Sequence, residues 1–178
     1  MPRIQPLRPE TADPKTAELL NGVKKTLGTV PNLVSTMAQS RAVANAYLGF
    51  AQALASGSLS ARLREQISLT VGQANECAYC IAAHCDIGQK VGLSTADLAQ
   101  ARRGRAADEK VNAALSFARK LVDQRGRVTD ADVEQVRLAG YSDGDIGEIV
   151  ANVALNIFTN YFNHVAETEI DFPAPPNS

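Results

Sequence analysis

The chain of 178 residues carries almost no net charge and shows no targeting or membrane-spanning pattern. Eighteen basic residues face 19 acidic ones, which leaves a formal net charge of -1. Proteins that bind nucleic acid usually present a basic field, so this balance argues against that function. Met1–Glu10 has no apolar core, and we expect no signal peptide there. The longest nearly apolar stretch, Ile149–Phe158, is too short to cross a bilayer, so we expect a cytoplasmic protein with no membrane partner.

Signals for β-strands are nearly absent, whereas signals for helices recur along most of the chain. β-Branched runs are short, and no Asn-Gly or Asp-Gly pair separates two alternating segments. Side chains that cap helix starts stand at Ser94, Thr129 and Ser142, and glycines that can end helices follow several helical runs. The pattern predicts an all-α protein of eight or nine helices, near residues 14–27, 32–39, 41–56, 60–75, 77–91, 95–103, 108–125, 129–139 and 143–166.

The composition is that of one globular domain. Apolar residues make up 45% of the chain and charged residues 21%, and no repeat, low-complexity tract or linker divides it. We therefore expect residues 1–178 to form a single domain that ends in a proline-rich tail over residues 172–178.

One predicted helix is too apolar for a single small chain to cover. The segment Ile146–Phe162 has apolar residues on nearly every side, interrupted by Glu148 and three asparagines. A helix that is apolar all round is normally buried on all sides. In an all-α chain of this length another subunit is the expected source of the extra cover, so we predict a homo-oligomer.

A polar row runs along the same helix. Its members recur every four residues, at Asn152, Asn156, Asn160 and His164. Buried amides need hydrogen-bond partners. The row therefore predicts either a polar seam against neighbouring helices or subunits, or a contact of His164 with the functional site.

Three closely spaced cysteines point to chemistry rather than to a disulfide scaffold. In a reducing compartment such spacing is more typical of redox or metal sites. Cys77, Cys80 and His84 are separated by three and four residues, so a helix places all three on one stripe. Cys85 is turned about 140° away from Cys80 and belongs to another face, and its role stays open.

The stripe has what thiol chemistry needs. Free backbone amides in the first turn of a helix stabilise a thiolate and lower the pKa of the thiol. An imidazole one turn from Cys80 can accept a thiol proton. On this reasoning alone Cys77, which lies nearer the helix end, is the more reactive thiol.

Other interpretations of the stripe are open. Buried cysteines can be plain core residues. Two thiolates and an imidazole are also three of the four ligands of a zinc site, which His164 could complete by folding back. Three ligands on one short helix converge poorly on a tetrahedral centre, so we predict no metal. No glycine-rich nucleotide motif follows a strand, so we predict no nicotinamide or flavin cofactor.

The arrangement Glu65, eleven residues, Cys77-x-x-Cys80, three residues, His84 resembles the motif of the AhpD-like alkylhydroperoxidase branch of the carboxymuconolactone decarboxylase family. The segment Leu59–Glu65 and the alanine-rich helices on both sides also resemble that family, over a core of roughly residues 45–125. The last helix is similar to that of the peroxidase-related members, at Asn156, Asn160, Asn163 and His164. The resemblance implies a single-domain all-α AhpD-like fold and assembly as a trimer or hexamer.

The resemblance also implies an activity, the reduction of small hydroperoxides by a dithiol. Cys80 would attack the peroxide and become a sulfenic acid, and Cys77 would then close the disulfide. Glu65 and His84 would form the proton relay. A thioredoxin-like protein or a lipoyl-type dithiol would return the electrons.

Two further residues are candidates for substrate binding. Tyr79 lies between the two cysteines and is expected to line the site, and His164 is the second candidate.

Two other functions remain compatible with the sequence. One is the decarboxylation of a lactone acid, for which the family is named, although that reaction needs no cysteine pair. The other is a non-enzymatic redox-sensing or metal-binding protein that uses the same thiols as a switch.

Overall fold

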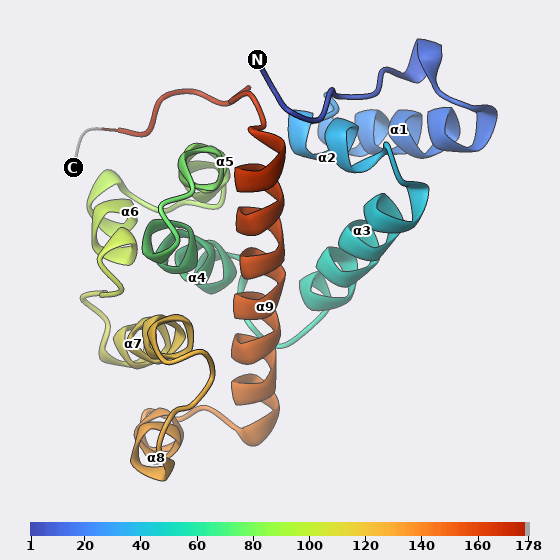
Figure 1. The fold of residues 1–178 in the computed structure, drawn as a ribbon. Helices are drawn as coiled ribbons and strands as arrows, with labels where there is room; N and C mark the ends of the chain where they lie inside the picture. Colours follow the sequence, from blue (N-terminus) through green and yellow to red (C-terminus); the bar gives the residue numbers. More distant parts are fainter. Residues whose placement is uncertain (177–178) are drawn as a thin grey trace.

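The computed structural model describes residues 1–176, and these form an all-α fold without strands (Figure 1). After the short 3-10 helix η1 (Pro9–Thr11), the described residues contain nine α-helices: α1 (Pro14–Leu27), α2 (Asn32–Met37), α3 (Arg41–Ala55), α4 (Ala61–Ala74), α5 (Ala78–Lys90), α6 (Thr95–Arg102), α7 (Glu109–Asp123), α8 (Asp130–Leu138) and α9 (Asp143–Ala166). The all-α prediction is confirmed, and each helix begins and ends within two residues of its predicted bounds.

The helix boundaries follow from local chemistry. Ser94, Thr129 and Ser142 begin α6, α8 and α9, and each forms a reciprocal pair of hydrogen bonds with an aspartate three residues later. Such a capping box satisfies two backbone donors that the helix itself leaves free. Gly28 ends α1 with a φ of 79°, a left-handed conformation that glycine adopts without strain. Of the expected proline-rich tail, residues 173–176 have no regular structure and residues 177–178 lie outside the described residues.

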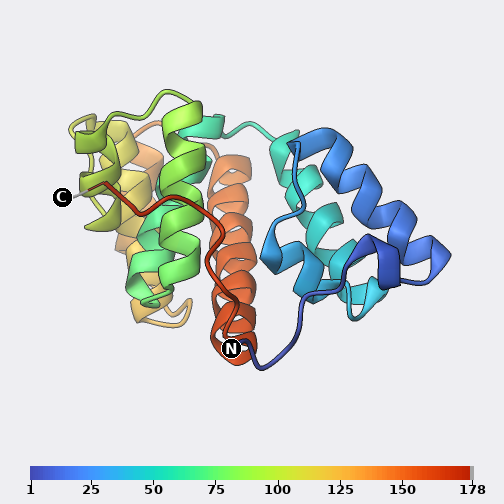
Figure 2. The same cartoon turned by 90° about the horizontal axis from the view of Figure 1, so that it is seen from above.

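Helix α9 runs through the middle of the molecule and separates two groups of helices. Figures 1 and 2 show α4–α8 on one side of it and α1–α3 on the other. The larger hydrophobic core lies among α4–α9 and includes the fully buried Ile67, Leu115 and Ile149. A second core packs α1, α2 and α3 against the start of α5, where Cys77 and Cys80 lie. The cysteines therefore sit where the amino-terminal helices meet the rest of the fold.

One face of α9 remains exposed in the single chain. On it Val150, Phe158, Tyr161 and Val165 are 44%, 38%, 58% and 63% exposed. These residues recur at helical spacing and form one apolar stripe, called here the α9 face. No helix within residues 1–176 has the length and apolar character to cross a membrane.

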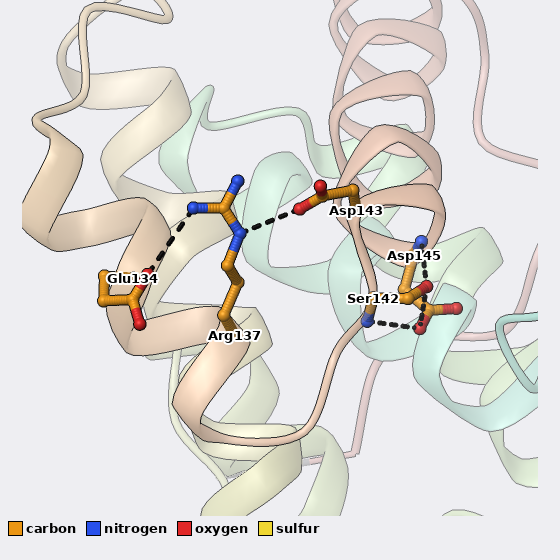
Figure 3. A network of polar contacts seen from close by, with 5 residues as sticks. All are labelled: Glu134, Arg137, Ser142, Asp143 and Asp145. Atoms are coloured by element: carbon orange, nitrogen blue, oxygen red, sulfur yellow. Dashed lines mark hydrogen bonds and ion pairs between the residues drawn. The ribbon is translucent and has the colours of Figure 1, made fainter.

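Polar contacts fix the start of α9 (Figure 3). The Ser142 hydroxyl accepts a hydrogen bond from the Asp145 backbone N–H at 3.1 Å, and the Asp145 carboxylate accepts one from the Ser142 backbone N–H at 2.8 Å. Arg137, at the end of α8, donates to Asp143 at 2.8 Å and pairs with Glu134 at 3.5 Å. The direction in which the chain leaves α8 and enters α9 is thereby fixed.

The start of α9 also holds the loop that leads into α4. The Glu148 carboxylate accepts hydrogen bonds from the backbone N–H groups of Ser58 at 2.9 Å and Leu59 at 3.1 Å. A Cβ at Gly57 would lie 2.4 Å from a carboxylate oxygen of Glu148, so no larger residue fits there without displacing that carboxylate. These contacts join α9 to α4, the helix that carries Glu65.

Replacement of Ser142 tests how much the cap contributes. The variant Ser142→Ala should lose about 1 kcal/mol of unfolding free energy, because the Asp145 backbone N–H loses its acceptor. A loss of this size lowers the melting temperature of a chain this long by about 2–4 °C. Ser142→Thr keeps the hydroxyl and should remain near the parent in urea unfolding. Equal stability of the alanine variant and the parent would show that the cap contributes nothing.

Candidate functional site

A tight turn between α4 and α5 positions Cys77. Glu76 adopts a left-handed φ of 55°, and the Cys77 backbone N–H donates to the Gly72 carbonyl at 2.9 Å. This turn makes Cys77 the N-cap residue of α5, where its sulfur accepts a hydrogen bond from the Cys80 backbone N–H at 3.4 Å. The thiol thus takes the place of the hydroxyl or carboxylate that usually caps a helix, at the positive end of the backbone dipole.

The two sulfurs of the Cys77-x-x-Cys80 segment lie together as free thiols. Their Sγ atoms are 2.6 Å apart, and the two residues are 1% and 3% exposed. The hydrogen bond to Cys80 lowers the pKa of Cys77 to about 7 against the opposing effect of burial, with the Cys80 backbone N–H adding to it. The same hydrogen bond, burial and the charge on Cys77 raise the pKa of Cys80. The pair therefore loses one proton near neutral pH and holds the second far more tightly.

Glu65 and His84 form a polar pair beside the thiols. His84 Nδ1 lies 2.7 Å from Glu65 Oε2, and the two side chains are 22% and 16% exposed. When Nδ1 carries the proton it donates to the carboxylate, which fixes the ring and leaves Nε2 free to accept. Helices α4 and α5 pack side by side, so the predicted neighbours Glu65, Cys80 and His84 come together at one place.

A cavity of about 500 Å³ opens beside this group. Cys80, Glu65 and His84 line it, whereas Cys77 does not. Most of the wall is apolar and comes from both groups of helices and from α9, through Leu27, Leu33, Val34, Leu48, Leu54, Ile87, Leu155 and Phe172. The thiol and the Glu65–His84 pair thus share one cavity with a mostly apolar wall that also includes Arg64. Such a combination is the usual form of a small-molecule site.

Tyr79 joins this cavity to the segment that follows α9. Its ring lines the cavity, while its hydroxyl donates to Asp171 at 2.8 Å and accepts from the Leu33 backbone N–H at 3.1 Å. Burial raises the pKa of Tyr79. Phe172 packs edge-on against the Tyr79 ring at a centroid distance of 5.6 Å. The hydroxyl is engaged by protein groups, so Tyr79 offers a bound molecule its ring.

Tyr47 also lines the cavity, and sequence reasoning missed it. Burial, and then the negative charges of Cys80 and Glu65, raise its pKa to about 12. The phenol therefore stays protonated at neutral pH and can act as a donor. No local signal marks it, because a tyrosine on an amphipathic helix is most often an ordinary packing residue.

Helix α9 contributes Asn163, a residue that the sequence analysis did not place in the site. His164 is exposed and does not line the cavity. Asn163 is buried instead, and its Nδ2 lies 3.2 Å from Cys80 Sγ and 4.0 Å from Cys77 Sγ. A helix turns about 100° per residue, so position 163 returns to within about 20° of Asn152 whereas position 164 is turned about 120° away. This angular spacing explains why Asn163, and not His164, shares the buried side of α9 with Asn152.

Other members of the row bond to α4 and the turn after it. Asn156 Nδ2 donates to Ser68 Oγ at 3.0 Å, and Asn75 Nδ2 donates to Asn160 Oδ1 at 2.9 Å. Asn152 donates back to the Glu148 carbonyl on its own helix. The row is thus a polar seam between helices within the chain.

Cys85 lies apart from the site. It is 3% exposed within the core formed by α4–α9, and burial raises its pKa. Within residues 1–176, no group of three or more His, Cys, Asp or Glu side chains is arranged to hold a metal ion, so the ligand set of the zinc hypothesis is not formed there.

Comparison with known proteins finds a family model that matches the part of the chain carrying this site. Residues 41–124, just under half of the chain, match the model of the carboxymuconolactone decarboxylase family. This segment contains Glu65, Cys77, Cys80 and His84. No curated protein matches the chain.

Several solved structures share the fold over nearly the whole chain. An AhpD-core, peroxidase-related protein from Ralstonia eutropha JMP134 is 24% identical with a TM-score of 0.87, covering 96% of this chain and 92% of its own. A peroxidase-related protein from Silicibacter sp. TM1040 is 24% identical with a TM-score of 0.84, and the match covers 98% of this chain and 96% of that protein. A variant of the debrominase Bmp8 in complex with 2,3,4-tribromopyrrole is 22% identical with a TM-score of 0.81, covering 97% and 93%. At these identities the likeness concerns the fold. The chain thus matches the carboxymuconolactone decarboxylase family over residues 41–124 and has the AhpD-like fold.

Proposed function

We propose that this protein is a thiol-dependent peroxidase that reduces organic hydroperoxides through Cys77 and Cys80. The observation that carries the proposal is the position of the thiol pair. Two reduced sulfurs lie 2.6 Å apart at a helix start, and one of them lines a cavity that also contains the Glu65–His84 pair. This is the arrangement of nucleophile, second thiol and proton-transfer group that a dithiol peroxidase requires.

Cys80 is the attacking residue in this proposal, because its sulfur lines the cavity. Its thiolate forms a bond to the terminal oxygen of the hydroperoxide while the O–O bond breaks. The sulfur loses two electrons and becomes a sulfenic acid, and the peroxide is reduced to an alkoxide that takes up a proton to become an alcohol. Access therefore decides the roles, although the hydrogen bond between the sulfurs lowers the pKa of Cys77.

Cys77 completes the oxidation. Its sulfur displaces the hydroxyl group of the sulfenic acid at Cys80, which leaves as water after gaining a proton, and a disulfide forms. The two sulfurs are already in contact, so this step needs little movement. A dithiol of the thioredoxin-like or lipoyl class then reduces the disulfide and is itself oxidised.

Glu65 and His84 carry protons between these groups. With Nδ1 held by the carboxylate, Nε2 of His84 is free to accept a thiol proton and later to return it to a departing oxygen, either directly or through a water molecule. Tyr47 is a protonated phenol in the same cavity and is available to donate to a bound peroxide oxygen.

The cavity favours a substrate with an apolar organic group. A cavity of about 500 Å³ with a mostly apolar wall far exceeds what hydrogen peroxide needs. An apolar group placed there is removed from water, which contributes binding free energy at roughly 25 cal/mol per Å² of buried apolar area.

Reductive debromination is a second candidate, favoured by the likeness to the debrominase Bmp8 along nearly the whole chain and by the apolar cavity. In that reaction the Cys80 thiolate would take bromine from a brominated ring, the ring carbon would take up a proton, and Cys77 would displace bromide to form the same disulfide. Both reactions use one site and consume two thiols.

We also propose that a second copy of the chain covers the α9 face, because four large apolar side chains are exposed there on one helix. A trimer or hexamer of the 18.9 kDa chain would bury them.

Counting thiols tests the peroxidase proposal. Reduced protein, freed of reductant and mixed with cumene hydroperoxide, should lose two thiols per chain, because a Cys77–Cys80 disulfide forms. Cys80→Ser should lose none to a disulfide, whereas Cys85→Ser should still lose two. An intact thiol count after several minutes would contradict the peroxidase proposal. If the protein instead loses two thiols when 2,3,4-tribromopyrrole replaces cumene hydroperoxide, that result would favour debromination.

The pH dependence of alkylation tests the electrostatics of the pair. The rate of alkylation by iodoacetamide follows the fraction of thiolate, which increases as the pH rises. Because the pKa of Cys77 is lowered to about 7, the first thiol to react should reach half of its maximal rate near pH 7. Cys80→Ala removes the hydrogen-bond donor and should move the midpoint toward that of an ordinary thiol, about 8.5. A midpoint near 8.5 in the parent protein would show that the sulfur contact does not stabilise a thiolate.

Sedimentation at micromolar concentration tests the assembly. The parent protein should sediment as a trimer or hexamer. Val165→Asp, which places a charge on the α9 face, should shift it toward monomer. Leu138→Asp is the matched control, because Leu138 is 79% exposed on α8 and lies outside that face. A monomeric parent protein would contradict the proposed contact.

A further inference from the structure

An amide from α9 reaches the reactive sulfur. Asn163 Nδ2 is 3.2 Å from Cys80 Sγ and 4.0 Å from Cys77 Sγ, so the donor lies closer to the sulfur that lines the cavity. Asn163 is 4% exposed, and water does not compete for its amide from outside. The contact joins residues 83 positions apart in the sequence, and only the packing of α9 against α5 creates it.

The same side chain carries an unused acceptor. Within residues 1–176, Asn163 Oδ1 is buried and has no hydrogen-bond partner. Leaving such a group unpaired costs about 1–3 kcal/mol, so an asparagine that served packing alone would be a poor choice at this position. The Asn163 side chain can therefore donate to a sulfur that accepts a hydrogen bond, as a thiolate does. It can also accept from a sulfur that carries a hydroxyl group, as in a sulfenic acid.

A second asparagine fixes the amide in place. Asn160, one turn earlier and fully buried, accepts a hydrogen bond from Asn75 Nδ2 at 2.9 Å. Asn75 caps the end of α4, two residues before Cys77. This bond ties α9 to the turn that presents the thiols, so Asn163 is held in register with Cys80.

A charged sulfur in this cavity needs such a donor. Burying an anion among apolar groups is costly unless hydrogen bonds replace those of water, and a hydrogen bond to a charged group contributes about 1.5–3 kcal/mol. The backbone N–H at the start of α5 serves Cys77 rather than Cys80. Apart from the Cys77 thiol, Asn163 is the side-chain donor to the Cys80 sulfur among the described hydrogen bonds.

We infer that Asn163 is a catalytic residue whose amide N–H stabilises negative charge on Cys80 Sγ, the sulfur to which the cavity gives access. When Cys80 carries the charge, the proton that the pair retains lies on Cys77, across the 2.6 Å contact. After oxygen transfer, Asn163 Oδ1 provides an acceptor for the hydroxyl of the sulfenic acid at Cys80. The role in peroxide reduction rests on the proposed function, whereas the stabilisation of the thiolate does not.

The test isolates Cys80. In a Cys77→Ser background, mass spectrometry follows the iodoacetamide alkylation of Cys80 between pH 5.5 and 9.5. Adding Asn163→Leu, which keeps the side-chain size but removes the donor, should lower the rate at pH 7 about tenfold and move the midpoint to higher pH. Adding Asn21→Leu, the same substitution at an exposed position on α1, should leave rate and midpoint unchanged.

A second variant keeps the test decisive if the leucine protein does not fold. Asn163→Asp has the same shape but replaces the donor by a carboxylate oxygen, so the midpoint should rise further because of repulsion between like charges. Circular dichroism of each variant establishes that it is folded. An unchanged midpoint in a folded leucine or aspartate variant overturns the inference.

Peroxide separates this inference from the proposed function. Suppose that the parent protein keeps all its thiols in cumene hydroperoxide while Asn163→Leu still shifts the alkylation midpoint. The proposed peroxidase function then fails, and the role of Asn163 at the thiolate stands. Rapid thiol loss in the parent with no shift in the variant gives the opposite result, in which the function stands and the role of Asn163 is refuted.

Discussion

The site depends on keeping a negatively charged sulfur in a pocket that is mostly apolar. Burial alone raises the pKa of a thiol and suppresses its reactivity. Two features oppose that effect here: the start of α5, where a backbone N–H reaches Cys77, and the contact between the two sulfurs, which lowers the pKa of Cys77 to about 7. The amide of Asn163, 3.2 Å from Cys80, adds a buried donor from α9. Protein dipoles thus take the place of water around the charge.

The amino-terminal helices supply most of the apolar wall, and the rest of the fold supplies the chemistry. Helices α1, α2 and α3 pack over the start of α5 and add Leu33 and Tyr47 to the cavity. The segment after α9 closes another side, through Phe172 and through the hydrogen bond between Tyr79 and Asp171. These parts lie outside the central Glu-Cys-Cys-His motif, so the motif alone does not determine what the cavity accepts.

Helix α9 joins the two groups of helices and presents a different chemistry on each side. Its buried side carries asparagines that bond to α4, to the turn before α5 and to a sulfur. Its opposite side is the apolar α9 face. The capping box at Ser142 and the contacts of Glu148 with Ser58 and Leu59 fix its start, so the position of Asn163 depends on contacts more than 20 Å away along a 24-residue helix.

The sequence by itself determined the features that depend on near neighbours. Helix caps such as Ser94 and Thr129 act within one turn, and helical spacing alone puts Cys77, Cys80 and His84 on one stripe, so both could be predicted without a fold. Only the tertiary structure decided which residues from distant segments meet these thiols. Tyr47, Phe172 and Asn163 reach the site because helices far apart in the chain pack together, and no local pattern encodes such contacts. The prediction of His164 as a site residue failed for the same reason. Residues four apart shift by about 40° per step around a helix of 3.6 residues per turn, so His164 leaves the buried side of α9 and Asn163 is buried instead.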